Sequence, residues 1–557
     1  MAYQFVVFAA IAIAASVIIS VVSNISARRR RIAALMAEYG KPPEADDFFQ
    51  LESVGRYAMY MAKHNPSRQR VDPITWNDLD MDKVFSRINS CQTSVGEEYL
   101  YHCLHELPLN SEALARREGL VQLFADDRDA RLDVQVLLAL QVGKENYNGL
   151  TALMFVPGVS TLKNPRLYTV LALLPLLMAA VLVVSVPFGV IGILAAFVVN
   201  MMVYFRTKNH ITIEIPSIKY LAGLLNCCKG LLKIKALENQ PHMEEIRRHY
   251  KTLKSLKRKM PGMSTSTTAG DLASMFLEYA NIMFLSDIRN YNRFMKTIKE
   301  RSEEFHALYR AFGEIDMSIC IASFRQSLPG YALPEFCEDR GIEFEEIYHP
   351  LIPAPVANTG IVKNDSIITG SNASGKSTFI KALAINGILA QTINTCAAKR
   401  YMARFSLIVT SMVLRDDLAG GESYFIVEIK SLKRILDLVR EYPCTCFIDE
   451  ILRGTNTVER IAASAAVLEY LHGQDALCVA ASHDIELTRI LAGEYDNYHF
   501  RERVTDSGVE FDYKLHDGPS TTRNALKLLR FMEFEDGIVN RAEKLAEGYA
   551  EDERWQL

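Results

Sequence analysis

The sequence lacks several features that would narrow its function. Its 557 residues contain ten scattered cysteines but no pair of C-x-x-C units, which argues against a zinc site. We find no internal repeat and no long low-complexity tract, so a repeat architecture is not indicated. The formal net charge of −4 argues against a wholly basic nucleic-acid binder but permits local basic faces. The length and a hydrophobic content of 49% indicate several domains with apolar cores.

The first long apolar run lies close to the N-terminus. Residues 5–22 carry no charge over 18 positions, which is just long enough to span a bilayer. No basic segment precedes this run, whereas residues 28–31 are consecutive arginines. Because a signal peptide carries its positive charge first, we predict a membrane anchor at residues 1–27 and not a cleaved leader. The positive-inside rule then places the N-terminus outside and the arginines in the cytoplasm.

The second apolar run is longer. Residues 167–205 hold 39 positions without a charge, which is too long for one membrane span and suits two. We expect a transmembrane hairpin that turns near residues 185–189. Both of its ends should be cytoplasmic, because basic residues flank them at Lys163, Arg166, Arg206 and Lys208. The alternative is a helical hairpin that is buried in a soluble core.

A glycine-rich segment carries the clearest chemical signal. It fits the pattern G-x-x-x-x-G-K-[ST] between a predicted strand at residues 366–369 and a predicted helix at residues 378–393, and it reads Gly370-Ser371-Asn372-Ala373-Ser374-Gly375-Lys376-Ser377-Thr378. Glycines let successive backbone N–H groups point at a triphosphate, and the helix N-terminus adds its positive end. We expect Lys376 to reach the β- and γ-phosphates of ATP and Ser377 to bind Mg²⁺. The alternative is a glycine-rich turn with an exposed lysine.

Two carboxylates end another apolar strand, which we predict at residues 446–450. Asp449 suits Mg²⁺ binding through water, and Glu450 is placed to polarise the attacking water. Such a pair is often only an exposed strand end. The phosphate loop upstream favours the functional interpretation, so we predict Asp449 as a metal ligand and Glu450 as a catalytic residue.

Two further segments complete the predicted site. Residues 417–425 place glycines before Ser423 at a helix start, which suits an anion site for a γ-phosphate presented by another subunit. The alternative is a helix cap, for which serine is well suited. His483 follows an apolar run that we read as a strand, and at that place a histidine can sense the γ-phosphate, although a lone histidine is usually structural.

These four segments, in this order, resemble the MutS family, the ATPases of DNA mismatch recognition. The family's phosphate loop reads GPNMGGKST, against residues 370–378 here. Its D-E-x-x-R-G-T matches residues 449–455, and its A-T-H corresponds to residues 481–483. Its signature D-L-x-x-G-x-S-T-F-x-x-E has Tyr424 in place of threonine and otherwise matches Asp417, Leu418, Gly421, Ser423, Phe425 and Glu428.

Other positions extend the resemblance. His349-Pro350 and Asn358 look like the family's R-H-P and V-x-N-D elements, and residues 513–518 look like its Y-K-L-x-x-G. Gln391 looks like the family's glutamine after the first helix, which adds it to the predicted nucleotide-binding residues. Residues 82–118 resemble, more loosely, the start of the family's helical core, where a T-x-x-G turn precedes a helix. We find no G-x-F-Y-E wedge, so the resemblance implies a member without the mismatch-recognition domain.

We therefore predict an α/β P-loop ATPase domain of the ABC-like type, C-terminal to a mainly α-helical MutS-like core, together with transmembrane helices. With the ATPase in the cytosol, the cysteines are expected to be reduced thiols. The predicted domains are an N-terminal anchor (1–27), the first part of the core (33–160), a membrane hairpin (167–205), the second part of the core (206–335) and the ATPase domain (340–557).

One segment of the second core part is strongly basic. Residues 229–259 hold ten lysines and arginines against three acidic residues, in a helical pattern broken at Pro241. Such a face could neutralise DNA phosphates or meet anionic lipid. It could equally be a solvated cytoplasmic face.

The predicted function is that of a multi-pass ATPase of the cell membrane, with its ATPase domain in the cytoplasm. We expect a homodimer that sandwiches ATP and Mg²⁺, in which Ser423 of the partner subunit completes each site and His483 reports the γ-phosphate. DNA, mismatched or otherwise structured, is the expected partner. The alternatives are a transporter-like ATPase, against which the absence of charges within the spans counts, and a nucleotide-controlled scaffold, against which the intact Glu450 counts.

Overall fold

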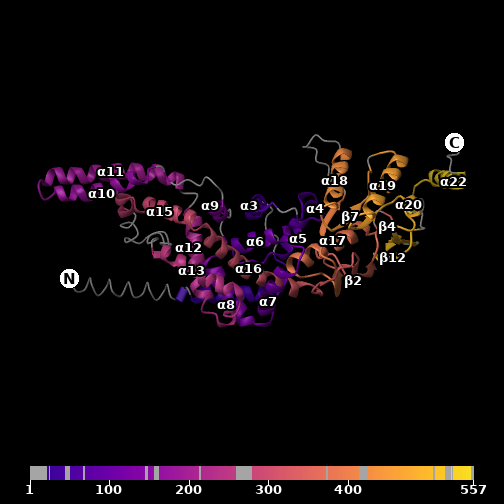
Figure 1. Ribbon diagram of the computed structural model, residues 1–557, viewed down its shortest axis with the longest axis horizontal. Helices are drawn as coiled ribbons and strands as arrows, with labels where there is room; N and C mark the ends of the chain where they lie inside the picture. The colour runs from indigo at the N-terminus through magenta and orange to yellow at the C-terminus, as the bar shows by residue number, and fades with distance from the viewer. Residues whose placement is uncertain are drawn as a thin grey trace. The chain divides into compact units, whose positions relative to one another are not determined.

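The computed structural model describes the parts of the chain that are drawn as ribbon in Figure 1. They are residues 22–43, 51–66, 69–144, 149–155, 162–211, 215–258, 279–371, 374–412, 424–505, 508–520 and 529–552, apart from residues 24, 163, 454, 530 and 533. The chain divides into two compact units. Unit 1 holds residues 1–66, 88–102 and 116–327, and unit 2 holds residues 67–87, 103–115 and 328–557.

The main sheet of unit 2 has the strand order β12-β9-β4-β8-β7-β6, in which β12 is antiparallel to β9 and the other pairs are parallel. Strands β4, β8, β7 and β6 are buried along their whole length, as is usual for parallel strands that helices cover on both faces. Their bounds are β4 (Ser366–Thr369), β6 (Leu407–Ser411), β7 (Cys444–Asp449), β8 (Ala476–Ala481), β9 (Asp496–His499) and β12 (His516–Asp517).

Helices and smaller sheets surround this main sheet. Helix α17 packs on β6, β7 and β8, α18 on β6, and α19 on β8. The other elements of unit 2 are α4 (Pro73–Asp78), α5 (Met81–Ile88), β1 (Glu335–Phe336), β2 (Ile342–Ile347), β3 (Asn358–Val362), α17 (Lys376–Ile393), β5 (Arg400–Ala403), α18 (Tyr424–Leu438), α19 (Thr457–His472), α20 (Ile485–Ile490), β10 (Glu502–Thr505), β11 (Gly508–Phe511) and α22 (Asp536–Asp552). The predicted α/β fold following a helical region is confirmed.

Residues 67–87 belong to unit 2, although the sequence assigns them to the helical core. Asp78, at the end of α4, accepts hydrogen bonds from Thr410 Oγ1 at 2.7 Å and Met412 N at 3.0 Å, at the end of β6. Asp80 forms an ion pair with Lys381 of α17 at 3.2 Å. Burial raises the pKa of Asp78 in spite of its hydrogen bonds. Polar contacts therefore tie α4 to the strand and helix beside the predicted site.

Unit 1 is helical throughout its described residues (Figure 1). Its longest buried element is α16, in which nearly every residue from Phe305 to Arg325 is buried. The helices are α2 (Leu51–Val54), α3 (Arg56–His64), α6 (Ser94–His105), α7 (Glu112–Asp126), α8 (Arg128–Gln141), α9 (Gly149–Phe155), α10 (Pro165–Val181), α11 (Val186–Ile211), α12 (Ile215–Leu231), η2 (Lys235–Leu237), α13 (Pro241–Arg258), α15 (Ser286–Glu300) and α16 (Ser302–Ser327).

The predicted hairpin of apolar helices is present as α10 and α11, which run side by side (Figure 1). Within the described residues, one helical segment, Val186–Thr207, is long and apolar enough to cross a membrane, and 17% of its apolar 18-residue window is buried inside the chain. Helix α10 is apolar but has only 17 residues. Most of the surface of the hairpin is therefore exposed among the described residues. The N-terminal run, residues 5–22, lies almost wholly outside the described residues.

The T-x-x-G pattern at the start of α6 has a structural cause. Asp316 of α16 accepts hydrogen bonds from the backbone N–H groups of Gln92 and Thr93 and from Thr93 Oγ1, the last at 2.6 Å. A Cβ at Gly96 would lie 2.3 Å from Asp316 Oδ2. Thr93 Oγ1 in turn accepts a hydrogen bond from Gly96 N at 3.0 Å, so Thr93 caps α6 and Asp316 holds Thr93 in place. Only a glycine at position 96 lets α6 approach this buried carboxylate so closely.

We predict that Gly96→Ala destabilises unit 1 by about 1–3 kcal/mol, because the added methyl group overlaps with Asp316. Gly119→Ala is the matched control, since Gly119 lies in α7 with its nearest neighbour at 3.9 Å. That change should be neutral or stabilise the helix by up to about 1 kcal/mol. The measurement is the free energy of unfolding of both variants and of the unmodified protein, by thermal or denaturant unfolding. Equal effects of both substitutions would contradict this account of the turn.

Candidate functional site

The predicted site residues come from loops that follow neighbouring strands of the main sheet. Strand β8 lies between β4 and β7, with Ala481 paired to both Ile368 and Asp449. Because these strands are parallel, their carboxyl ends meet at one edge of the sheet, which is where ligands bind in open α/β folds. The phosphate loop, Glu450 and His483 are thereby brought together from distant parts of the sequence.

The phosphate loop joins β4 to α17 and depends on two glycines with positive φ. Gly370 has φ +141° and Gly375 has φ +104°, values that other residues rarely adopt. A Cβ at Gly370 would also lie 2.6 Å from Phe500 O, and one at Gly375 would lie 3.0 Å from the Tyr513 ring. The glycines therefore serve both the turn and the close packing around it.

Within the loop, the Ser374 hydroxyl donates a hydrogen bond to Ser371 O at 2.8 Å. The helix begins at Lys376, so Ser377 and Thr378 lie in its first turn, where backbone N–H groups face an anion. Asn372 and Ala373 lie outside the described residues.

Lys376 occupies the loop with its own side chain. Its Nζ donates hydrogen bonds to Gly370 O at 2.5 Å and to Ser371 O at 2.8 Å. Burial lowers the pKa of Lys376 to about 8, against the opposing pull of the carboxylates of Glu450 and Asp449. The amine therefore lies where it can release the two carbonyl oxygens and bind phosphate oxygens instead.

Glu450 lies between the side chains of His483 and Arg453. His483 Nε2 is 2.7 Å from Glu450 Oε1, and Arg453 forms an ion pair with Glu450 Oε2. Burial acts to raise the pKa of Glu450, but the hydrogen bonds from His483 and Arg453 outweigh it and hold the pKa below its usual range. Glu450 also has φ +59°, an uncommon conformation for a residue other than glycine. The side chain is thus an ionised hydrogen-bond acceptor in a constrained position.

Asp449 has the properties of a ligand for Mg²⁺ or for its bound water. It is 5% exposed at the end of β7, and its Oδ1 atom is buried without a hydrogen-bond partner among the described residues. A buried carboxylate oxygen without a partner is costly, and a hard cation would satisfy it. Ser377 supplies a hydroxyl oxygen from the loop after β4. These oxygen atoms fit the preference of Mg²⁺.

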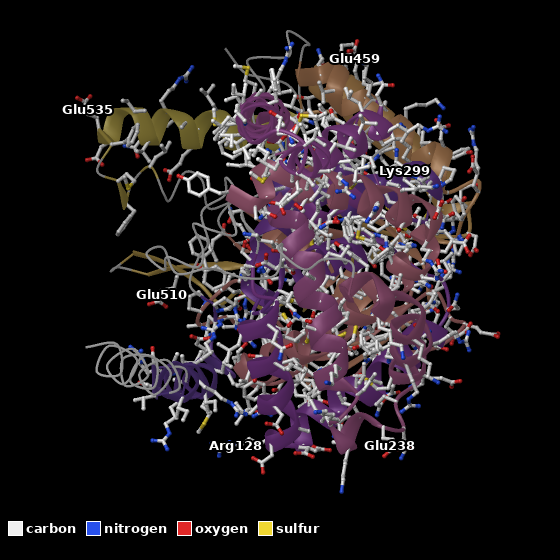
Figure 2. The ribbon with its side chains drawn as sticks, turned by 90° about the vertical axis from the view of Figure 1, so that its left-hand side faces the viewer. Arg128, Glu238, Lys299, Glu459, Glu510 and Glu535 are labelled. Carbon is white, nitrogen blue, oxygen red and sulfur yellow. The ribbon has the colours of Figure 1, made fainter. Side chains whose placement is uncertain are left out.

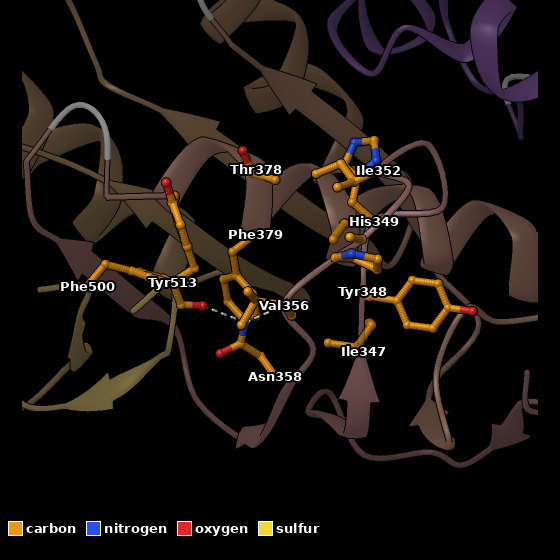
Figure 3. Close-up of a pocket in the computed structure, with 14 residues that line it drawn as sticks. Ile347, Tyr348, His349, Ile352, Val356, Asn358, Thr378, Phe379, Phe500 and Tyr513 are labelled. Atoms are coloured by element: carbon orange, nitrogen blue, oxygen red, sulfur yellow. Dashed lines mark hydrogen bonds between the residues drawn. The ribbon is translucent and has the colours of Figure 1, made fainter. Parts of the chain in front are cut away.

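A cavity of about 310 Å³ adjoins the phosphate loop (Figure 3). Its walls include Phe379, Phe500, Tyr513 and Val356, and Gly375 and Thr378 of the loop also line it. Asn358 fixes the Tyr513 segment, because its Nδ2 donates to Tyr513 O at 3.0 Å and its Oδ1 accepts from Leu515 N at 2.9 Å. Apolar and aromatic walls beside a phosphate site suit a planar base.

His349 supplies a polar group to this cavity. Burial, with a contribution from Lys381, lowers its pKa to about 4, so the imidazole is neutral. Its Nδ1 atom accepts a hydrogen bond from Leu351 N at 3.3 Å, which leaves the proton on Nε2. The ring therefore has one hydrogen-bond donor of its own.

The structure does not bring every predicted residue together. Gln391 lies near the C-terminal end of α17, about 22 Å along the helix from Lys376. It is 2% exposed, and its amide bonds to Ser406 N at 3.0 Å and Gly387 O at 3.1 Å. Its position gives the predicted nucleotide contact no support. Ser423 lies outside the described residues, directly before α18.

Sequence reasoning missed most of the cavity wall. Tyr513 and Asn358 were identified only as motif matches, and Phe379 and Phe500 carried no signal of their own. The remaining hint is that Phe500 follows the strand next to β4, which only the strand order reveals.

Comparison with known proteins assigns the C-terminal part of the chain. Residues 366–549 match the model of MutS domain V. The DNA mismatch repair protein MutS of Natronomonas pharaonis is 31% identical over 279 residues, which are 47% of this chain and 32% of that protein. MutS of Thermus aquaticus is 27% identical over 322 residues, 56% of this chain and 38% of that protein. The DNA mismatch repair protein MutS 2 of Halobacterium salinarum is 31% identical over 268 residues, which are 45% of this chain and 30% of that protein. The chain spans about a third of the length of these relatives.

Lys376 should give nucleotide binding a pH dependence. Phosphate oxygens favour the ammonium form and should raise the pKa of Lys376 above the value of about 8 that burial gives it. Binding should therefore take up protons just above pH 8, and affinity should fall as the pH rises through this value. Calorimetric titration in buffers of different ionisation enthalpy measures the uptake. An affinity that stays constant from roughly pH 7 to 9.5 would contradict the prediction.

Proposed function

We propose that this chain is a member of the MutS family whose domain V ATPase couples ATP hydrolysis at the edge of the main sheet to DNA binding at a membrane. The observation that carries the proposal is the meeting of the phosphate loop, Asp449-Glu450 and His483 at the carboxyl ends of β4, β7 and β8. In this arrangement one group can hold the phosphates, another the metal and a third the attacking water.

The proposed mechanism assigns each step to a described residue. Lys376 leaves Gly370 O and Ser371 O and stabilises charge on the transferring phosphoryl group. Ser377 and Asp449 would hold Mg²⁺, which neutralises charge on the β- and γ-phosphates when bound. Glu450, kept ionised by His483 and Arg453, accepts a hydrogen bond from the attacking water and orients it.

We assign the cavity beside the loop to the nucleoside base. Tyr513, Phe379 and Phe500 offer aromatic surface, and neutral His349 offers an Nε2–H donor to a ring nitrogen or carbonyl. The cavity is continuous with Gly375 and Thr378, so a nucleotide whose phosphates lie on the loop places its base there.

A dimer would complete the site. Ser423 stands immediately before α18, and Glu428 of that helix accepts a hydrogen bond from Leu452 N, in the loop that carries Glu450. The start of α18 is thus tied to the catalytic loop of its own chain. We propose that Ser423 of the partner subunit contacts the γ-phosphate, which would link ATP binding to dimer formation.

DNA binding is proposed on the names of the relatives and on one helix of unit 1. Each protein with which we compared this chain bears the name of a DNA mismatch repair protein. Helix α13 buries Met243, Ile246 and Leu253 and packs on α12 and α16, while its exposed side chains include Arg247, Arg248, Lys251 and Lys254. A row of unburied cations on a rigid helix can neutralise successive phosphates without reading sequence.

The membrane location is proposed on the surface of the α10–α11 hairpin. Exposed apolar side chains cover it over most of its length, and contiguous exposed apolar surface marks a site of interaction with a membrane or a partner. They are Leu167, Val170, Leu173, Leu176, Leu177, Val183, Val184, Val186, Phe188, Val190, Ile191, Leu194, Val198, Val199, Met202 and Phe205. Hydrocarbon would cover this surface, with the ATPase domain in the cytoplasm and the hairpin as one part of a multi-pass protein with its N-terminus outside.

The first experiment measures ATPase rate in nanodiscs, with and without duplex, mismatched and branched DNA. We expect DNA to stimulate the rate, and Glu450→Gln to lower it by about 10²- to 10⁴-fold while ATP still binds. A Glu450-dependent rate that no DNA changes would overturn the DNA proposal and favour transport-like work. ATP binding without turnover in the unmodified protein would favour a nucleotide-controlled scaffold.

The second experiment tests the membrane with a matched pair of substitutions. Ile191 of α11 is 63% exposed and Ile490 of α20 is 51% exposed. If lipid surrounds the hairpin, Ile191→Asp should cost about 2.5–3.5 kcal/mol of insertion and reduce the alkali-resistant membrane fraction. Ile490→Asp should leave that fraction unchanged. Equal behaviour of both variants, or release of the unmodified protein by alkali, would contradict membrane integration.

A further inference from the structure

The phosphate loop of this chain contains a contact that its family resemblance does not explain. Where the family loop GPNMGGKST has proline, this chain has Ser371. The Ser371 hydroxyl donates a hydrogen bond to Glu502 Oε2 at 2.6 Å. Glu502 belongs to none of the motifs that define the site, yet it is only 8% exposed. A buried carboxylate therefore lies against a loop whose ligand is a polyanion.

The fold places Glu502 there firmly. Strand β9 pairs with β4 up to His499 and Thr369, and Phe500 N then donates a hydrogen bond to Thr369 O at 2.9 Å. Phe500 O lies so close to Gly370 that no side chain fits between them. Strand β10 begins two residues later with Glu502, and it pairs with β11 in a hairpin. Glu502 is thus carried into the site by the backbone that packs against the loop.

Glu502 also acts on the lysine of the loop. Its carboxylate is among the groups that raise the pKa of Lys376 against the effect of burial. The same lysine donates to Ser371 O, while the Ser371 hydroxyl donates to Glu502. Glu502 thus adds to the negative charge that Glu450 and Asp449 place near Lys376, and its carboxylate oxygen accepts the hydrogen bond of the loop's Ser371.

The carboxylate of Glu502 beside the phosphate loop has an electrostatic consequence for nucleotide binding. A nucleotide that binds must bring its phosphate oxygens close to Glu502, and like charges in a partly dehydrated site repel strongly. The repulsion grows with the charge of the nucleotide. ATP, which carries one more phosphate than ADP, therefore loses more affinity than ADP does.

We propose that Glu502 is a specificity-determining residue that weakens nucleotide binding at the phosphate loop, and weakens ATP binding more than ADP binding. The inference rests on the proposed ATP site. It assigns a lowered ratio of ATP affinity to ADP affinity at that site to the charge of Glu502. Glu502 acts on the nucleotide by charge, and its hydrogen bond to Ser371 keeps the charge in place.

The test compares the affinities of Mg-ATP and Mg-ADP for the full-length protein, measured by equilibrium dialysis in a Glu450→Gln background that prevents turnover. Glu502→Gln removes the charge but keeps an oxygen that can accept from Ser371. We expect it to tighten ATP binding by about tenfold and ADP binding clearly less, so that the ATP-to-ADP affinity ratio rises by at least about threefold.

Two controls separate charge from structure. Glu502→Asp keeps the charge and shortens the side chain, so it disturbs the hydrogen bond but should leave the affinity ratio close to that of the unmodified protein. Glu510 lies on β11 of the same hairpin and is exposed at the surface (Figure 2). Glu510→Gln makes the same change of net charge and should alter neither affinity.

The outcomes are distinct. An unchanged ratio in Glu502→Gln, or an equal change in Glu510→Gln, would overturn the role of Glu502. A change in Glu502→Asp as large as that in Glu502→Gln would make the contact structural. If Glu502→Gln fails to fold, Glu502→Met removes the charge at similar side-chain length. The ratio of ATP affinity to ADP affinity is then measured on that variant, with the same expected rise. Failure of the unmodified protein to bind either nucleotide would instead contradict the proposed ATP site itself.

Discussion

The site depends on one geometric constraint, the parallel alignment of β4, β8 and β7 in the main sheet. Parallel strands end at the same edge, so the loops that follow them converge whatever their separation in sequence. The phosphate loop, Glu450 and His483 are each short continuations of a buried strand. The rigid strands leave little freedom to these groups, and a substitution that shifts one strand end would disturb all three.

The charged and polar groups at this edge are held by contacts within the protein. Lys376 bonds to loop carbonyl oxygens, Glu450 to His483 and Arg453, and Ser371 to Glu502. Nucleotide binding therefore exchanges protein contacts for nucleotide contacts, and its net free energy is smaller than the new contacts alone suggest. Such a site responds to small differences in ligand charge, which is what a nucleotide-controlled switch requires.

Local patterns predicted the strands, the loop and the apolar hairpin because each is encoded within one short segment. The sequence did not reveal Glu502 at the loop, the aromatic wall of the cavity or the attachment of α4 to β6, since each of these joins segments that only the folded sheet brings together. Gln391 shows the converse: a motif position was matched, but the length of α17 carries the side chain away from the loop. The apolar character of residues 167–205 was readable from composition, whereas the exposure of the hairpin required the structure.

The most direct test of the account is a structure of the Glu450→Gln protein with ATP and Mg²⁺. We predict triphosphate on the loop, with Lys376 Nζ moved from Gly370 O and Ser371 O to the phosphates. Ser377 and Asp449 should lie at the metal, and the base should lie against Tyr513 in the cavity. Nucleotide bound elsewhere, or a metal that neither Asp449 nor Ser377 approaches directly or through water, would contradict the assignment of this sheet edge as the ATP site.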